Sequence, residues 1–181
     1  MNQEKQGAMT EEEKRAIFRE RARKLARPVD KAGSDNDLEV VEFLLSGERY
    51  GLEAGHIREV YPFGDITHVP CTPPFVLGVI NVRGQILSVI DIRKFFDMPE
   101  TGVAHNKVII LHSDVMEFGI IADEISGIRR VKTEDLQPSL PTLTGLRADY
   151  MKGVTGDRMI VLSAERLLSD ARMIVNEEVT A

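Results

Sequence analysis

Several residue types and patterns are scarce in this chain, and each scarcity excludes a class of protein. The 181 residues contain no tryptophan and one cysteine, Cys71. A single cysteine cannot form an intramolecular disulfide, so nothing in the sequence indicates an oxidising compartment. No run approaches the roughly 18 apolar residues of a membrane span, and residues 1–15 lack the apolar segment of a signal peptide. We therefore expect a cytoplasmic protein without direct membrane insertion.

An excess of basic residues is also missing. The formal net charge is −6, and because residues 1–37 carry nine Lys/Arg against eight Asp/Glu, residues 38–181 hold a net charge near −7. Neutralising phosphates supplies most of the affinity for nucleic acid, and aromatic side chains supply base stacking. An acidic body without tryptophan argues against nucleic acid. A small-barrel nucleic-acid-binding protein is kept as the alternative function.

Sequence signatures of catalysis are absent as well. The four histidines have no metal-ligand spacing, and there is no phosphate loop, dinucleotide fingerprint or nucleophile elbow. Asp123 and Glu124 follow one another at the end of an expected strand, where successive side chains point to opposite faces and cannot share acid and base work. We predict no enzyme activity, no catalytic residue, no metal and no cofactor. A thiol enzyme or esterase built around Cys71 is a third, separate possibility.

The most informative stretch runs from Phe75 to Arg93 and reads FVLGVINVRGQILSVIDIR. Two apolar, largely β-branched segments flank Arg83-Gly84, a pattern that predicts a hairpin of two buried strands. Gly84 permits a positive φ, so the chain can reverse and lift Arg83 onto the rim of the sheet. Val79 and Ile90 are expected in the core. Asp91 and Arg93 close the second strand with opposite charges.

Other strand patterns form two similar series. Strands are expected at residues 40–45, 49–53 and 57–61 before the central hairpin, and at 108–111, 118–122, 127–131 and 158–163 after it. Three segments of the first series are echoed in order in the second: 50–52 by 118–120, 57–60 by 128–131, and 75–79 with Arg83 by 150–154 with Arg158. Repetition at offsets near 70 residues predicts an internal repeat.

This repeat predicts a mainly β fold of two small five-stranded SH3-like β-barrels packed side by side. We expect a first barrel at about 38–100, a second at about 105–163, a C-terminal segment that returns to the first with a short helix, and a tail at 171–181. Residues 1–37 are expected to be an N-terminal helical extension and linker, because Thr10 and Glu13 form a capping box and Pro28 follows the basic segment. That helix either faces solvent or helps to select a partner.

Five segments together resemble the CheW-like chemotaxis coupling proteins over roughly residues 38–170. They read EFLLSGERYGL, IREV, TPPFVLGVINVRGQILSVIDIR, FGIIADEISGIRRV and YMKGVTGDRMIVLSAERLL. The sharpest element is Asn81-Val82-Arg83-Gly84 followed by Asp91-Ile92-Arg93. The resemblance implies two five-stranded barrels and a non-enzymatic adaptor. It also implies two partners, the cytoplasmic tip of methyl-accepting chemoreceptors and the regulatory domain of a CheA-type histidine kinase.

The resemblance also implies a partner-binding surface. For the receptor it points to Ile57, Val60 and Arg83 as contacts, with Glu59 and Asn81 as rim or orienting groups and Gly84 completing the turn. An amphipathic receptor helix laid in a groove between the barrels would suit these residues. Arg83 also has a purely structural interpretation, in which it pairs with Asp91 or caps carbonyl groups of its own turn. The sequence leaves both roles of Arg83 open.

Overall fold

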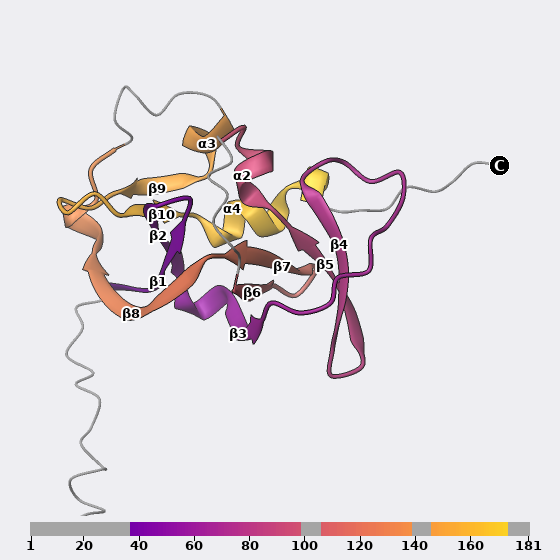
Figure 1. The fold of residues 1–181 in the computed structure, drawn as a ribbon. Coiled ribbons are helices and arrows are strands. Elements are labelled where there is room, and N and C mark those ends of the chain that lie inside the picture. The colour runs from indigo at the N-terminus through magenta and orange to yellow at the C-terminus, as the bar shows by residue number, and fades with distance from the viewer. Residues whose placement is uncertain (1–36, 99–105, 139–145, 174–181) are drawn as a thin grey trace, which may run out of the picture. The chain divides into compact units, whose positions relative to one another are not determined.

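The computed structural model describes residues 37–98, 106–138 and 146–173, all within one compact unit (Figure 1). Its strands are β1 (Asp37–Leu45), β2 (Glu48–Glu53), β3 (Ile57–Pro62), β4 (Val76–Val82), β5 (Gln85–Ile90), β6 (Lys107–His112), β7 (Glu117–Ala122), β8 (Glu124–Lys132), β9 (Met151–Val154) and β10 (Ile160–Leu162). Its helices are α2 (Ile92–Phe95), α3 (Leu146–Asp149) and α4 (Ala164–Ser169). The predicted mainly β class is confirmed. The predicted N-terminal helix lies outside the described residues, and no helix within them has the length and hydropathy to cross a membrane.

The strands form two five-stranded sheets. One has the order β8-β1-β2-β10-β9, and we call it the β1 barrel; the other has the order β3-β6-β7-β5-β4, and we call it the β3 barrel. In the β3 barrel the chain beyond β3 reaches the far edge strand, where Thr67 bridges Val79 of β4. In the β1 barrel Gln137, beyond β8, bridges Val154 of β9 in the same way. Both sheets therefore curl until their edges meet, which removes exposed strand edges.

The strands are shared between the barrels differently from the predicted division at residues 38–100 and 105–163. The hairpin β1–β2 joins β8, β9 and β10, whereas β3, β4 and β5 join the hairpin β6–β7. Each repeat has the order hairpin, single strand, hairpin, and its first hairpin completes the sheet of the other repeat. Four pairings make this exchange: β2 with β10 and β5 with β7 are parallel, and β1 with β8 and β3 with β6 are antiparallel. No local sequence pattern encodes pairing between such distant strands. The predicted barrel boundaries followed the order of the chain and therefore did not include the exchange of hairpins.

Strand register tests the internal repeat. Two of the predicted echoes occupy corresponding strands: 50–52 with 118–120, and 75–79 with 150–154. The third matched Val60 with Val131 and is wrong by three residues. Val60 pairs with Ile109, and the residue at the corresponding place in the β1 barrel, paired with Val41, is Ile128. Apolar residues recur at every third position along β8, so sequence comparison alone permits both alignments.

One hydrophobic core connects the two barrels. Phe43 and Tyr50 of the β1 barrel and Ile109 and Phe118 of the β3 barrel belong to the same cluster of buried side chains. The short helices α2 and α4 add further buried residues to it. Burial of apolar surface is the dominant favourable contribution to folding. Because the largest cluster belongs to both sheets, the barrels stabilise each other.

Two residues of the central hairpin were predicted to lie in the core, and the prediction is correct for one of them and wrong for the other. Ile90 is fully buried in the shared core. Val79 is only partly buried, because on β4 the buried positions are Val76, Gly78, Ile80 and Val82. Ile80 therefore takes the place predicted for Val79, in a second cluster inside the β3 barrel.

Aspartate substitutions on the two faces of β4 test this facing. Ile80→Asp is expected to unfold the protein, since an unpaired carboxylate buried in an apolar core costs several kcal/mol. Val79→Asp, one residue earlier, is the matched control and is expected to lower the melting temperature by only a few degrees, about 1 kcal/mol. Circular dichroism during thermal unfolding measures both. A native spectrum and melting point for Ile80→Asp would contradict the assignment.

Candidate functional site

The tip of the β4–β5 hairpin is a two-residue turn. Val82 pairs with Gln85, and the residues between them, Arg83 and Gly84, have φ angles of 52° and 90°. Two positive φ angles in a two-residue loop correspond to a type I′ turn, whose twist matches that of the strands. The Asn81 side-chain oxygen accepts a hydrogen bond from the Gly84 amide at 2.7 Å. The turn is therefore fixed by its own sequence.

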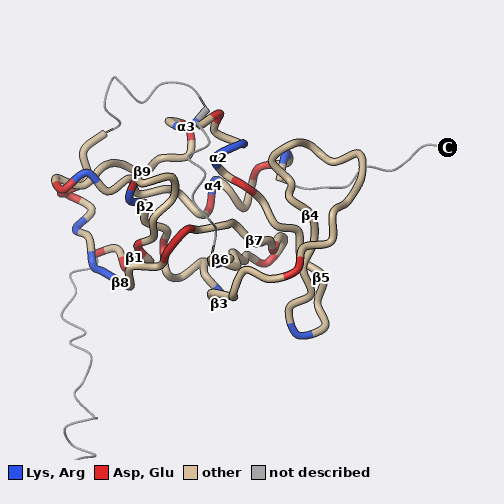
Figure 2. Tube along the Cα trace, in the orientation of Figure 1, with Lys and Arg blue, Asp and Glu red and all other residues tan. Residues whose placement is uncertain are grey.

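Arg83 reaches from this tip to the opposite edge strand of its sheet. Its Nη2 lies 2.9 Å from Oε2 of Glu59 on β3, while 78% of the Arg83 side chain remains exposed. The alternative pairing with Asp91 is wrong, because the Asp91 carboxylate accepts hydrogen bonds from Arg93 at 2.9 and 2.7 Å, and both residues are buried. Figure 2 shows basic colouring at the tip of the β4–β5 hairpin. The structure thus presents a cation at one end of the β3 barrel.

The other predicted site residues divide between the turn and β3. Asn81 and Gly84 are exposed and build the turn. Ile57 is partly buried and packs against the shared core, so its environment differs from that of an open contact residue. Val60 is exposed on β3. The structure brings Glu59 and the turn together and leaves Ile57 largely in a packing role.

The sequence analysis missed four residues around the turn. Ile86 pairs directly with Asn81, and its side chain is 62% exposed. Residues opposite each other in an antiparallel pair share a face, so a two-residue turn implies that Ile86 lies on the same exposed face as Asn81. That signal was available in the sequence. The other three, Arg58, Gln85 and Glu117, belong to three different strands, and no spacing rule connects them.

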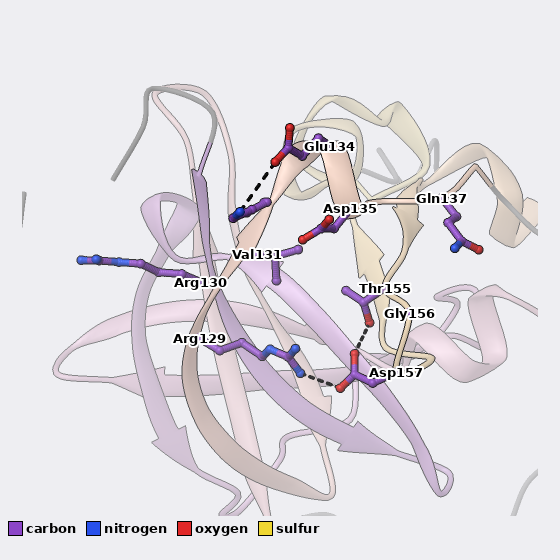
Figure 3. A pocket seen from close by; sticks show the side chains of 10 residues that line it. Arg129, Arg130, Val131, Glu134, Asp135, Gln137, Thr155, Gly156 and Asp157 are labelled. Atoms are coloured by element: carbon purple, nitrogen blue, oxygen red, sulfur yellow. Dashed lines mark hydrogen bonds and ion pairs between the residues drawn. The ribbon is translucent and has the colours of Figure 1, made fainter. Parts of the chain in front are cut away.

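The β1 barrel has a polar pocket of about 600 Å³ (Figure 3). Its lining residues are Arg129, Arg130, Val131, Lys132, Glu134, Asp135, Gln137, Thr155, Gly156 and Asp157. Arg129 and Asp157 point toward each other and pair at 2.9 Å, and Lys132 pairs with Glu134 at 3.7 Å. None of the predicted site residues lines this pocket, and its charges largely pair with one another. The hairpin tip is therefore the stronger candidate site.

The ion pairs of this pocket shift the protonation of Asp157. The hydrogen bond from Arg129 is the largest cause, and together with hydrogen bonds from Thr155 and Arg49 it holds the pKa of the Asp157 carboxyl below its usual value of 3.8. A folded-state pKa below the unfolded value means that the charged carboxylate stabilises the folded protein at neutral pH. This contribution is lost as the pH falls from about 4 through the depressed pKa.

Asp157→Asn tests this linkage. At pH 7 the variant is expected to be less stable than the parent by up to about 1 kcal/mol, a small effect because the pair is solvent-exposed and screened. The difference should begin to shrink below about pH 4, because the carboxyl group of the unfolded parent becomes protonated there while that of the folded parent stays charged. Urea unfolding at pH 7 and pH 3 measures it. A difference that grows toward acid pH would contradict the assigned direction of the shift.

Comparison with known proteins gives a consistent result. The CheW-like domain model matches residues 39–172. The chain is 30% identical over 155 residues to the chemotaxis protein CheW of Treponema pallidum (strain Nichols), which covers 81% of this chain and 91% of that protein. It is also 30% identical over 154 residues to the chemotaxis protein CheW of Klebsiella aerogenes, which covers 82% and 92%.

A solved structure is similar in fold. The crystal structure of the scaffolding protein TtCheW from Thermoanaerobacter tengcongensis matches with a TM-score of 0.63 and 29% sequence identity, over 72% of this chain and 87% of that one. These similarities support an adaptor or scaffold role rather than the nucleic-acid-binding alternative.

Proposed function

The chain belongs to the CheW-like domain family, and we propose that it is a non-enzymatic adaptor that couples methyl-accepting chemoreceptors to a CheA-type histidine kinase. Its partners are the cytoplasmic tip of the receptor and the regulatory domain of the kinase. The adaptor performs no chemical step and holds both partners in one complex in the cytoplasm. The family relationship supports the adaptor function. The geometry of the β4–β5 hairpin tip supports this tip as the receptor-binding surface.

The proposed surface rests mainly on the exposed guanidinium of Arg83, which is held against the Glu59 carboxylate at the hairpin tip. Arg83 is mostly exposed, yet one of its nitrogens lies 2.9 Å from the Glu59 carboxylate. Ile86 and Val60 are two of the four exposed large apolar residues in the described part of the chain. An arginine combined with apolar side chains suits an amphipathic receptor helix, whose apolar residues and acidic groups contact one face.

The six predicted residues have different roles in this proposal. Arg83 contacts the receptor directly, with Val60 and the newly identified Ile86 as apolar contacts. Glu59 orients the guanidinium of Arg83, and Asn81 and Gly84 maintain the turn. Ile57 supports β3 from the shared core.

The kinase regulatory domain is proposed to bind a separate barrel surface. The family resemblance implies that this domain has the same fold, so the contact would join two related barrels. Two different surfaces allow receptor and kinase to be held simultaneously, which an adaptor requires. Ternary co-sedimentation of the purified protein with a receptor cytoplasmic fragment and a kinase would test the function as a whole; a protein that retains neither partner would contradict it.

Arg83→Asn tests the receptor surface without disturbing the turn. Asn followed by Gly is a preferred type I′ sequence, so the fold and melting temperature should be unchanged. Loss of an interface arginine typically costs about 2 kcal/mol, or roughly 30-fold in Kd. Titration of a labelled receptor cytoplasmic fragment measures the affinity.

Arg158→Asn is the matched control for this substitution. Arg158 also has a positive φ angle, 67°, and lies exposed between β9 and β10 of the β1 barrel. Its replacement removes an equal charge and preserves the backbone preference, and receptor affinity should stay within about twofold because the residue is outside the proposed surface. Equal loss of affinity in both variants would indicate a non-specific charge effect and reject Arg83 as a contact.

A further inference from the structure

Three side chains from three strands meet next to the Arg83 turn, and we call them the Arg58 clasp. Arg58 of β3 donates from Nη1 to Oε1 of Gln85 at 2.8 Å, and it also pairs with the carboxylate of Glu117 at the start of β7. Gln85, the first residue after the turn, donates from Nε2 to Oε2 of Glu117 at 2.6 Å. Each member therefore contacts the other two.

Arg58 points toward this cluster because β3 is irregular at that residue. Ile57 pairs with Leu111 and Glu59 with Ile110, so Arg58 is an extra residue in the strand. Such a bulge bends the strand locally and redirects a side chain. The guanidinium, with several donors in a fixed planar arrangement, can then bond to two strands at once.

The clasp extends to the residues proposed to bind the receptor. Arg58 Nη2 lies 3.4 Å from Oε1 of Glu59, and Arg83 Nη2 lies 2.9 Å from the other oxygen of the same carboxylate. Glu59 is thus held between two arginines. A single exposed ion pair contributes little and leaves a long side chain mobile, whereas a connected network restricts its members.

The β1 barrel contains a comparable arrangement near its own exposed tip residue, Arg158. Arg129 of β8 pairs with Asp157 between β9 and β10, and Asp157 also pairs with Arg49 of β2 at 3.0 Å. Arg49 corresponds to Glu117 because they precede Tyr50 and Phe118, which occupy equivalent positions in the two hairpins. There the paired group at the tip is the acid Asp157, whereas in the β3 barrel the clasp lies beside the tip and the tip arginine, Arg83, is paired with Glu59.

We infer that Arg58, together with Gln85 and Glu117, positions Glu59 and the Arg83 turn for receptor binding without contacting the receptor. Arg58 is a positioning residue, and its effect passes through the Glu59 carboxylate and the start of β5. This role rests on the proposed function, so it can be observed only if the affinity for the receptor depends on Arg83. The expected partner group at Arg83 is an acidic side chain on the receptor helix.

A double-mutant cycle separates positioning from direct contact. Arg58→Met removes the donors and keeps most of the apolar stem, and it should weaken binding of the receptor cytoplasmic fragment about tenfold when Arg83 is present. In the Arg83→Asn background the same change should alter Kd by less than about twofold, because there is no guanidinium left to position. Equal losses in both backgrounds would show direct contact and overturn the inference.

Two further variants show whether a lower receptor affinity comes from loss of the Arg58 contacts or from a general disturbance of the fold. Arg129→Met breaks the comparable arrangement in the β1 barrel and should leave the affinity within about twofold. Arg58→Lys keeps the charge but cannot reproduce the planar donor geometry, so its affinity should lie between those of the parent and Arg58→Met. An Arg58→Lys protein that binds as tightly as the parent would overturn a geometric role, because charge alone would then be sufficient.

A spectroscopic readout reports positioning independently of the receptor. In the free protein, the NMR signals of the Arg83 side-chain Nε–Hε group and of the Gly84 amide should shift in Arg58→Met and stay unchanged in Arg129→Met. Unchanged signals in Arg58→Met would overturn the inference. Normal receptor binding by Arg83→Asn alone would instead reject the proposed receptor surface, so the two failures are distinguishable.

Discussion

The fold depends on parallel pairing between strands from opposite halves of the chain. Tyr50 of β2 pairs with Ile160 of β10, and Gly119 of β7 pairs with Val89 of β5. Neither half contains a complete sheet, because each lends its first hairpin to the other. Without these pairings both barrels would expose open strand edges, which are prone to associate with other chains. The shared core and the position of the β4–β5 hairpin both follow from this exchange.

Barrel closure also explains why the candidate site lies where it does. β3 and β4 are the two edges of their sheet, yet Glu59 on β3 contacts Arg83 at the end of β4. Residues distant in strand order become neighbours only because the sheet curls. The site therefore belongs to the closed barrel and to no single strand, and Arg58, Gln85 and Glu117 gather at the same end for the same reason.

Local sequence predicted nine of the ten strands and missed β9 (Met151–Val154), and it failed where distant segments meet. Arg83-Gly84 between apolar segments indicated the hairpin, because a two-residue loop has few permitted conformations. Val79 was placed on the wrong face because β4 is apolar on both sides, so period-two alternation has no contrast to follow. The Arg83–Glu59 pair was not predictable, because it depends on the order of the strands in the sheet. Asp91 is nearer to Arg83 in sequence and was one expected partner, but its carboxylate pairs with Arg93.

The exchange of hairpins also fixes the order in which the barrels can be completed as the chain is synthesised. All strands of the β3 barrel have been made once β7 ends at Ala122, whereas the β1 barrel lacks its last strand until Leu162. At the start of that interval the β1–β2 hairpin has been made but lacks its partners β8, β9 and β10, and β10 is missing until the end. A ribosome that stalls after β7 would therefore leave one finished barrel attached to an unpaired apolar hairpin, a species that chaperones and proteases are suited to recognise.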